Sequence, residues 1–302
     1  MSGALPKLSI LMTVCNGERY LREALDALLG QTYRDFELVA VNNGSTDTTG
    51  DILSDYAARD GRIRVLTNPV DPEGTFTKGI ATAFAAATGE YVAVNDADDN
   101  SAPERLARQV AYLDAHPDAV LVASHYETID ETGAVFGEGC PPTGHDEILA
   151  AYMHGNPIAH SSVMYRRDAA VQAGGYDPAL TFASDYNLQL NMAAQGGRFS
   201  VLPEKLVQIR VHAAQTSLLP GKAVIRTREP FDLLCKAGRL PGLSLDNRVA
   251  NAKAVTKAQL RYAAALWMAG RKSDGWREAV AAFLRKPLYS LAFSGYQLIR
   301  PS

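Results

Sequence analysis

The chain has little cysteine: Cys15, Cys140 and Cys235 lie far apart among its 302 residues. Their spacing matches no metal-ligand motif, and a disulfide framework would need more cysteines in a much shorter chain. We therefore expect a reduced, cytoplasmic protein without disulfides, in which Cys15 is a small buried residue.

Long apolar runs and two nucleotide-binding motifs are also absent. No stretch reaches the roughly 18 apolar residues of a membrane-spanning helix, and residues 1–6 lack the features of a signal peptide. The segment Cys15–Arg19 (CNGER), after the first predicted strand, has one glycine where a dinucleotide-binding turn needs G-x-G-x-x-G. No G-x-x-x-x-G-K-[ST] string occurs. These absences argue against a dinucleotide-dependent dehydrogenase and a P-loop nucleotidase.

The composition is that of a globular protein with unevenly distributed charge. Hydrophobic residues make up 47% and charged residues 21%, and the length suffices for one large α/β domain with an appendage. The net charge is −3, yet residues from Leu218 onward include 15 Lys or Arg and 5 Asp or Glu. The first 217 residues have 15 basic and 28 acidic ones. We expect the two regions to face different partners.

Short apolar segments alternate with segments of helical spacing. In the first half we predict strands over residues 8–14, 36–41, 62–66 and 90–94, with helices over 19–29, 48–58 and 75–87. In the second half we predict strands over 119–124, 162–165 and 205–211, with helices over 167–173 and 185–195. This alternation predicts an α/β fold with a mostly parallel sheet flanked by helices.

Two regions follow another pattern. Between Glu127 and Pro157 the periodicity weakens, and six Gly and Pro residues from Gly133 to Gly144 predict a hairpin or long loop. Beyond Leu218 the chain predicts helices interrupted at Pro230, at Pro241-Gly242 and at Gly270. We therefore expect a helical C-terminal appendage over residues 218–302.

An acidic run follows the strand predicted at 90–94. Asp96, Asp98 and Asp99 crowd several carboxylates at one sheet edge. Crowded carboxylates repel one another unless a hard cation shares them, and Mg²⁺ or Mn²⁺ bound with phosphate oxygens is the usual solution. The run thus predicts a metal–diphosphate site, and the alternative is a solvated loop that caps the next helix.

Ligands of an open α/β sheet bind beyond the carboxyl ends of its strands. Three polar segments follow predicted strands and should converge there: Val14–Glu18, Asn42–Ser45 and Asp96–Asp98. This convergence predicts one binding site formed by three loops.

In order and spacing, the segments LSILMTVCNGE (Leu8–Glu18), VNNGSTDTT (Val41–Thr49), DADD (Asp96–Asp99) and GGYD (Gly174–Asp177) resemble glycosyltransferase family 2. The resemblance runs from about Leu8 to about Ser217. It implies a GT-A fold over residues 1–217, with a nucleotide-sugar half over about 1–100 and an acceptor half over about 101–217. It also implies inverting transfer of a sugar from a nucleotide-diphosphate donor to a hydroxyl, in polysaccharide or envelope glycan synthesis.

The resemblance assigns roles to residues at matching positions. Asp98 would bind Mn²⁺ or Mg²⁺, with Asp96 near the ribose or the metal, and His212 would approach the diphosphate or the metal. Asp185 would be the catalytic base. The positions that would contact the nucleotide sugar are Val14, Asn16, Glu18, Asn43, Ser45, Lys78, Asp96 and Ala97.

Each assignment has a structural alternative. Asn43 to Asp47 can serve as a turn and helix cap, and Asp185 can simply occupy the first turn of a helix. His212 can pack at a strand end and Lys78 can be solvated, whereas His160 is expected to be a structural histidine with a hydrogen-bond partner.

The chain also departs from the family at the nucleobase position. Asn42-Asn43-Gly44-Ser45 stands where the family usually has Asp-Asp-Gly-Ser, and Cys15 where it often has Tyr. An asparagine side chain both donates and accepts hydrogen bonds, so this position is compatible with more than one nucleobase in the donor. Two other functions stay open: a nucleotidyltransferase, which would want a Gly- and Arg-rich loop that is absent, and a non-catalytic sugar-nucleotide-binding protein.

The basic C-terminal region interleaves aromatic residues such as Trp267 and Trp276 with cations such as Arg271 and Lys272. Basic helices of this kind can lie on an anionic membrane surface. This suggests that residues 218–302 make peripheral contact with the inner face of a membrane, near a glycan or lipid-linked acceptor. The alternative is an appendage that packs on the acidic region or forms a homodimer. Nucleic-acid binding is not expected, since no recognition motif accompanies the charge.

Overall fold

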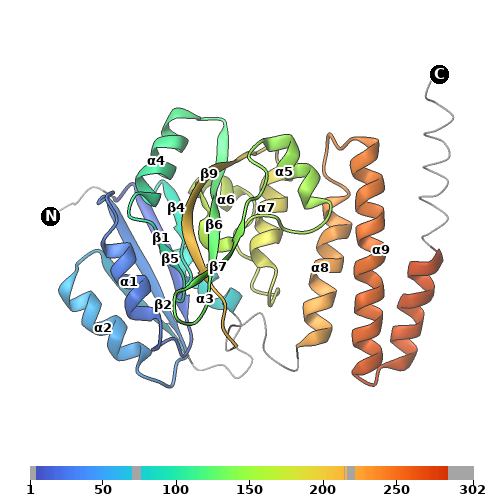
Figure 1. Ribbon diagram of the computed structural model, residues 1–302, viewed down its shortest axis with the longest axis horizontal. Coiled ribbons are helices and arrows are strands. Elements are labelled where there is room, and N and C mark those ends of the chain that lie inside the picture. The colour runs from blue at the N-terminus through green and yellow to red at the C-terminus, as the bar shows by residue number, and fades with distance from the viewer. Residues whose placement is uncertain (1–4, 70–75, 214, 216–221, 285–302) are drawn as a thin grey trace. The chain divides into compact units, whose positions relative to one another are not determined.

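The computed structural model describes residues 5–69, 76–213, 215 and 222–284. The chain divides into two compact units, one formed by residues 1–148 and 158–218 and the other by 149–157 and 219–302 (Figure 1). The strands are β1 (Leu8–Val14), β2 (Phe36–Asn43), β3 (Ile63–Asn68), β4 (Tyr91–Val94), β5 (Asn100–Ser101), β6 (Ala119–Ile129), β7 (Val135–Gly139), β8 (Met164–Arg166) and β9 (Arg198–Arg210). The helices are α1 (Leu21–Leu29), α2 (Thr49–Arg59), α3 (Phe76–Ala86), α4 (Arg105–Ala115), α5 (His145–Tyr152), α6 (Arg167–Gln172), α7 (Ser184–Ala194), α8 (Ala223–Ala237) and α9 (Leu245–Met268), with a 3₁₀ turn at His160–Ser162.

The described strands of the first unit form one sheet in the order β3-β2-β1-β4-β8-β6-β9-β5, with β7 joined to β6. Parallel pairing predominates, because β1 pairs with β2 and β4, β2 with β3, and β6 with β9. Strands β8, β5 and β7 pair antiparallel with their neighbours. The expected mostly parallel sheet flanked by helices is confirmed.

Strand β1 lies at the centre of the core. All seven of its residues are buried, as expected for a parallel strand covered on both faces. Its register places Leu8 opposite Phe36 of β2 and Tyr91 of β4, so the three strands end at the same edge. Helix α3 packs closely here, since a Cβ at Gly79 would lie 1.9 Å from Thr13 Oγ1.

The hairpin expected between Glu127 and Pro157 is present, because β6 continues to Ile129 and pairs antiparallel with β7. Three other predictions differ from the structure. The weakly patterned segment also contains helix α5. Strand β9 starts at Arg198, seven residues before the predicted strand. Pro230 was expected to interrupt a helix, yet α8 runs through it. A proline inside a helix costs about 3 kcal/mol, and here burial of Phe231, Leu233 and Leu234 on the same helix offsets that cost.

The second unit has a core of its own. Buried Phe231 and Leu234 of α8 pack with Val255, Tyr262 and Leu266 of α9. The predicted interruptions at Pro241-Gly242 and Gly270 are confirmed, because they lie in the connection between α8 and α9 and after α9. Residues 272–284 are helical, and the predicted helical region beyond them lies outside the described residues. In the described part of the chain, no helix has the length and apolar content to cross a membrane.

Candidate active site

The loops after β1 and β2 are joined by hydrogen bonds. Asn16, which has a positive φ of 52°, accepts from the Thr46 amide at 2.8 Å and donates its own amide to Ser45 Oγ at 3.0 Å. The Glu18 carboxylate accepts from Thr48 Oγ1 at 2.6 Å. Two residues predicted to contact the nucleotide sugar, Asn16 and Glu18, thus also hold the two loops together. Their contact with a ligand stays a prediction.

The other predicted nucleotide contacts lie at or beside the same edge. Val14 and Ala97 are buried in the core, whereas Asn43 ends β2 and accepts from Asn68 Nδ2 at 2.9 Å. Lys78 is exposed in the first turn of α3. Cys15 was expected to be buried but is exposed, because β1 ends at Val14 and Cys15 already belongs to the connecting loop.

Two of the three residues predicted near the metal, Asp98 and His212, meet at the end of the sheet. Asp98, in the turn after β4, and His212, after β9, approach to 2.8 Å between Oδ2 and Nε2. The Asp98 side chain is 31% exposed and that of His212 is 11% exposed, so the pair is held in place but accessible. The described residues contain no group of three or more His, Cys, Asp or Glu side chains that could hold a metal ion.

The side chains of Asp98 and His212 suit a metal site in which the bound substrate supplies the remaining ligands. Mn²⁺ and Mg²⁺ are commonly bound by one or two protein carboxylates, with phosphates and water filling the other positions. A carboxylate with an imidazole suits Mn²⁺ better than Mg²⁺, since Mg²⁺ prefers oxygen ligands. Asp98 and His212 would therefore hold the ion together with a bound diphosphate.

Asp99 belongs to the support of this turn. Its buried carboxylate accepts from Ser161 Oγ at 2.5 Å and from the Arg210 amide at 2.8 Å. Arg210 also donates from Nε to the Asp98 carbonyl at 3.1 Å. Burial, with the nearby charges of Asp96 and Asp98, raises the pKa of Asp99 well above its usual value. The Arg210 side chain, 2% exposed, thus fixes the backbone that presents Asp98.

A second buried arginine holds the start of the same turn. Arg105 of α4 donates to Asn95 Oδ1 at 3.1 Å, to Ser101 Oγ at 2.8 Å and to the Val94 carbonyl at 2.8 Å. Complete burial lowers the pKa of Arg105 to about 9, although the charges of Asp99 and Asp96 act in the opposite direction. We did not predict either arginine as part of the site, because a single charged residue in a helix or strand usually indicates a solvated face.

Asp185 lies in the first turn of α7, beside the acidic turn. It shares a small pocket with His160 and Tyr176. Its charge acts on Asp96: burial raises the pKa of the Asp96 carboxyl, His160 opposes this, and the charges of Asp98 and Asp185 raise it further. Asp96 therefore lies close enough to Asp98 and Asp185 for their charges to raise its pKa.

His160 lies between Asp96 of the acidic turn and two buried tyrosines. Its Nε2 lies 2.9 Å from the Tyr176 hydroxyl, and the Tyr165 hydroxyl donates to that of Tyr176 at 3.2 Å. On the other side of the ring, His160 Nδ1 lies 3.9 Å from Asp96 Oδ1. The expected hydrogen-bonded histidine is therefore also a neighbour of the acidic turn.

Two solved structures share this fold. TarS of S. aureus, solved in complex with UDP-GlcNAc, matches with a TM-score of 0.69 at 18% identity, over 91% of this chain and 79% of its own. The mannosyltransferase PcManGT from Pyrobaculum calidifontis, solved in complex with GDP-Man and Mn²⁺, matches with a TM-score of 0.62 at 20% identity, over 98% and 88%. The fold of this chain is thus the GT-A fold.

Sequence comparison gives the family. Residues 9–173 match the family model "Glycosyl transferase family 2". AmsE of Erwinia amylovora, an amylovoran biosynthesis glycosyltransferase, is 30% identical over 205 residues, which are 67% of this chain and 75% of AmsE. The chain belongs to glycosyltransferase family 2 and is a transferase enzyme, which decides against the nucleotidyltransferase and the non-catalytic binding protein.

Proposed function

We propose that this enzyme transfers a sugar, with inversion, from a nucleotide-diphosphate donor to a hydroxyl acceptor in polysaccharide or envelope glycan synthesis. The donor class is supported by the UDP-GlcNAc and GDP-Man complexes of TarS and PcManGT. The biosynthetic setting is supported by AmsE. The observation that carries the proposal is the 2.8 Å approach of His212 to Asp98, with Asp185 close to the same acidic turn.

The residues divide the reaction between them. Asp98 and His212 would hold Mn²⁺ or Mg²⁺, which when bound neutralises the departing diphosphate. The acceptor hydroxyl attacks the anomeric carbon as the bond to the diphosphate breaks, and Asp185 takes the hydroxyl proton. Asp96, beside His160, would orient the donor near its ribose or the metal. Holding donor and acceptor in line supplies much of the rate enhancement.

The nucleobase is expected to be read beside Asn42 and Asn43. The side-chain Oδ1 of Asn42 accepts from the Ser45 amide at 3.0 Å, so this side chain shapes the loop. Asn43 at the end of β2 can both donate and accept, which is compatible with uracil and with guanine. Uridine and guanosine donors should therefore be compared directly.

The acceptor is proposed to be a glycan or a lipid-linked saccharide, with residues 218–302 in peripheral contact with a membrane. Trp267 and Trp276 are 50% and 66% exposed, and the cations Arg271 and Lys272 lie beside them in the sequence. Such exposed aromatic and basic side chains suit an anionic interface. The part of this basic region over residues 285–302 lies outside the described residues.

Release of nucleotide diphosphate from UDP- and GDP-sugars tests the proposal. We expect slow release that requires Mn²⁺, stops with a chelator and is abolished by Asp98→Ala. Asp55→Ala is the matched control, because Asp55 is an aspartate of α2 whose side chain is 57% exposed. Release that survives both the chelator and Asp98→Ala would overturn the metal-dependent reaction.

A further inference from the structure

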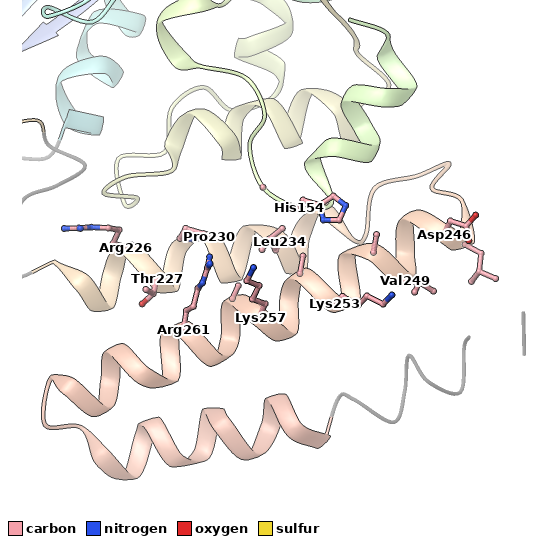
Figure 2. A pocket seen from close by; sticks show the side chains of 15 residues that line it. His154, Arg226, Thr227, Pro230, Leu234, Asp246, Val249, Lys253, Lys257 and Arg261 are labelled. Atoms are coloured by element: carbon pink, nitrogen blue, oxygen red, sulfur yellow. The ribbon is translucent and has the colours of Figure 1, made fainter. Parts of the chain in front are cut away.

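A groove runs between α8 and α9 in the second unit, outside the proposed active site (Figure 2). Its floor is apolar and includes Pro230, Leu234 and Ala254. Its rim has the cations Lys253, Lys257 and Arg261, and Figure 2 shows Lys257 and Arg261 extending from α9 toward α8. An apolar floor beside a cationic rim suits a ligand that is both anionic and amphipathic.

The three cations form a column along one face of α9. They are spaced four residues apart, so they follow one another by about one helical turn and repel at neutral pH. Among the residues that the structure describes, none of the three takes part in an ion pair, and the groove lining contains one acidic residue, Asp246. An anionic ligand would relieve the repulsion along this column.

The chemistry of the rim favours phosphate. Two lysines supply point charges with several donors, and the arginine presents a planar fork that matches two phosphate oxygens. The floor offers no matching set of charges, so the rest of the ligand has to be apolar. A phosphate attached to hydrocarbon meets both requirements.

We propose that this groove binds the phosphate of an anionic phospholipid, with the adjoining acyl chain on its floor, and thereby attaches the second unit to a membrane surface. Large apolar side chains at the end of α9 and on the helical residues 272–284 that follow it support a membrane as the source of the lipid, since Trp267, Met268, Trp276 and Phe283 are 50%, 79%, 66% and 66% exposed. The inference deepens the proposed membrane contact of residues 218–302 and is independent of the sugar-transfer chemistry.

Co-sedimentation of the full chain with vesicles tests the groove. The chain should sediment with vesicles of phosphatidylcholine and phosphatidylglycerol but not with phosphatidylcholine alone. Because each cation near an anionic surface contributes about 1 kcal/mol, we expect the variant Lys253→Gln/Lys257→Gln/Arg261→Gln to bind on the order of 100-fold more weakly.

A charge-matched variant separates the groove from diffuse attraction. Arg22→Gln/Arg239→Gln/Arg248→Gln removes the same charge at exposed positions outside the groove lining and should keep most of the binding. Equal losses in the two variants would overturn the groove while leaving the membrane contact in place. No sedimentation of the unmodified chain would overturn both, whereas Mn²⁺-dependent release of nucleotide diphosphate would be unaffected in either case.

Two further measurements complete the test. Ala254→Asp should also weaken vesicle binding, because it places a carboxylate on the apolar floor, and circular dichroism should show that the helical content is retained. Sedimentation velocity without lipid measures the oligomeric state of the chain. It tests whether a second copy of the chain, rather than a lipid, binds in the groove. A dimer that the groove variant converts to a monomer would overturn the lipid proposal.

Discussion

His212 Nε2 lies 2.8 Å from Asp98 Oδ2, although 114 residues separate the two along the chain. This contact joins the end of β9 to the turn after β4. We expect His212→Ala to weaken Mn²⁺ binding, measured by titration in the presence of nucleotide diphosphate, by more than the about 10–100-fold typical of residues outside the metal's own ligands. His116→Ala, at an exposed histidine of the same unit, should leave binding unchanged. Unaltered Mn²⁺ affinity in His212→Ala would show that this imidazole is not a ligand.

Asp185→Asn tests the catalytic base. The amide keeps the shape of the side chain but cannot take the proton from the acceptor hydroxyl, so kcat for transfer should fall by about 10²–10⁴-fold. The KM for the donor should change little, since Asp185 acts on the acceptor. Asp168→Asn serves as the control because its side chain is 87% exposed on α6. Full transfer activity in Asp185→Asn would contradict the assignment.

Tyr176→Phe tests whether the hydrogen-bonded hydroxyls of Tyr165 and Tyr176 position His160. The change removes the hydroxyl that lies 2.9 Å from His160 Nε2 and leaves that ring nitrogen without this partner. We expect a stability loss of about 1–3 kcal/mol in urea unfolding, together with a lower kcat for transfer. Tyr165→Phe is the matched variant, since it removes the outer hydroxyl of the same chain without touching His160. An equal loss of kcat in both variants would argue against a specific role for the Tyr176–His160 contact.

Arg105→Met tests the buried support of the acidic turn. The guanidinium is fully buried and donates to Asn95, Ser101 and Val94, so its removal deletes three buried hydrogen bonds and the positive charge that acts on Asp99 and Asp96. We expect a loss of about 3–5 kcal/mol in the free energy of unfolding. Arg105→Lys should restore only part of this, because an ammonium cannot reproduce the planar fork. A lysine variant as stable as the unmodified protein would show that charge alone matters at this position.

The sequence allowed us to predict which strands end at the site, but not the buried arginines that hold the acidic turn in place. Leu8–Val14 and Tyr91–Val94 are short apolar runs, and buried parallel strands have this pattern whatever surrounds them. The pairing of Asp98 with His212 was expected only through the family resemblance, since local pattern cannot relate such distant positions. Arg105 and Arg210 were missed because their burial depends on partners contributed by other elements. Helix α5 was missed because its eight residues follow a Gly- and Pro-rich segment that predicts a loop.

Glu37 gives a pH-dependent prediction away from the active site. Burial acts to raise the pKa of this carboxyl, but hydrogen bonds from Ser9 and Thr88 and the charge of Arg64 lower it overall. A carboxyl with a folded pKa below its unfolded value, about 4.5, stabilises the protein above that pH and loses the effect as the pH falls through the folded pKa.

Glu37→Gln should therefore destabilise the protein at pH 7 by about 1–3 kcal/mol in urea unfolding, because hydrogen bonds to a charged group become neutral ones. The difference between Glu37→Gln and the unmodified protein should shrink as the pH is lowered below about 4. Glu90→Gln is the control, since its side chain is 55% exposed and should change stability little at either pH. A Glu37→Gln difference that stays constant from pH 7 to pH 3 would mean that ionisation of Glu37 contributes nothing to folding.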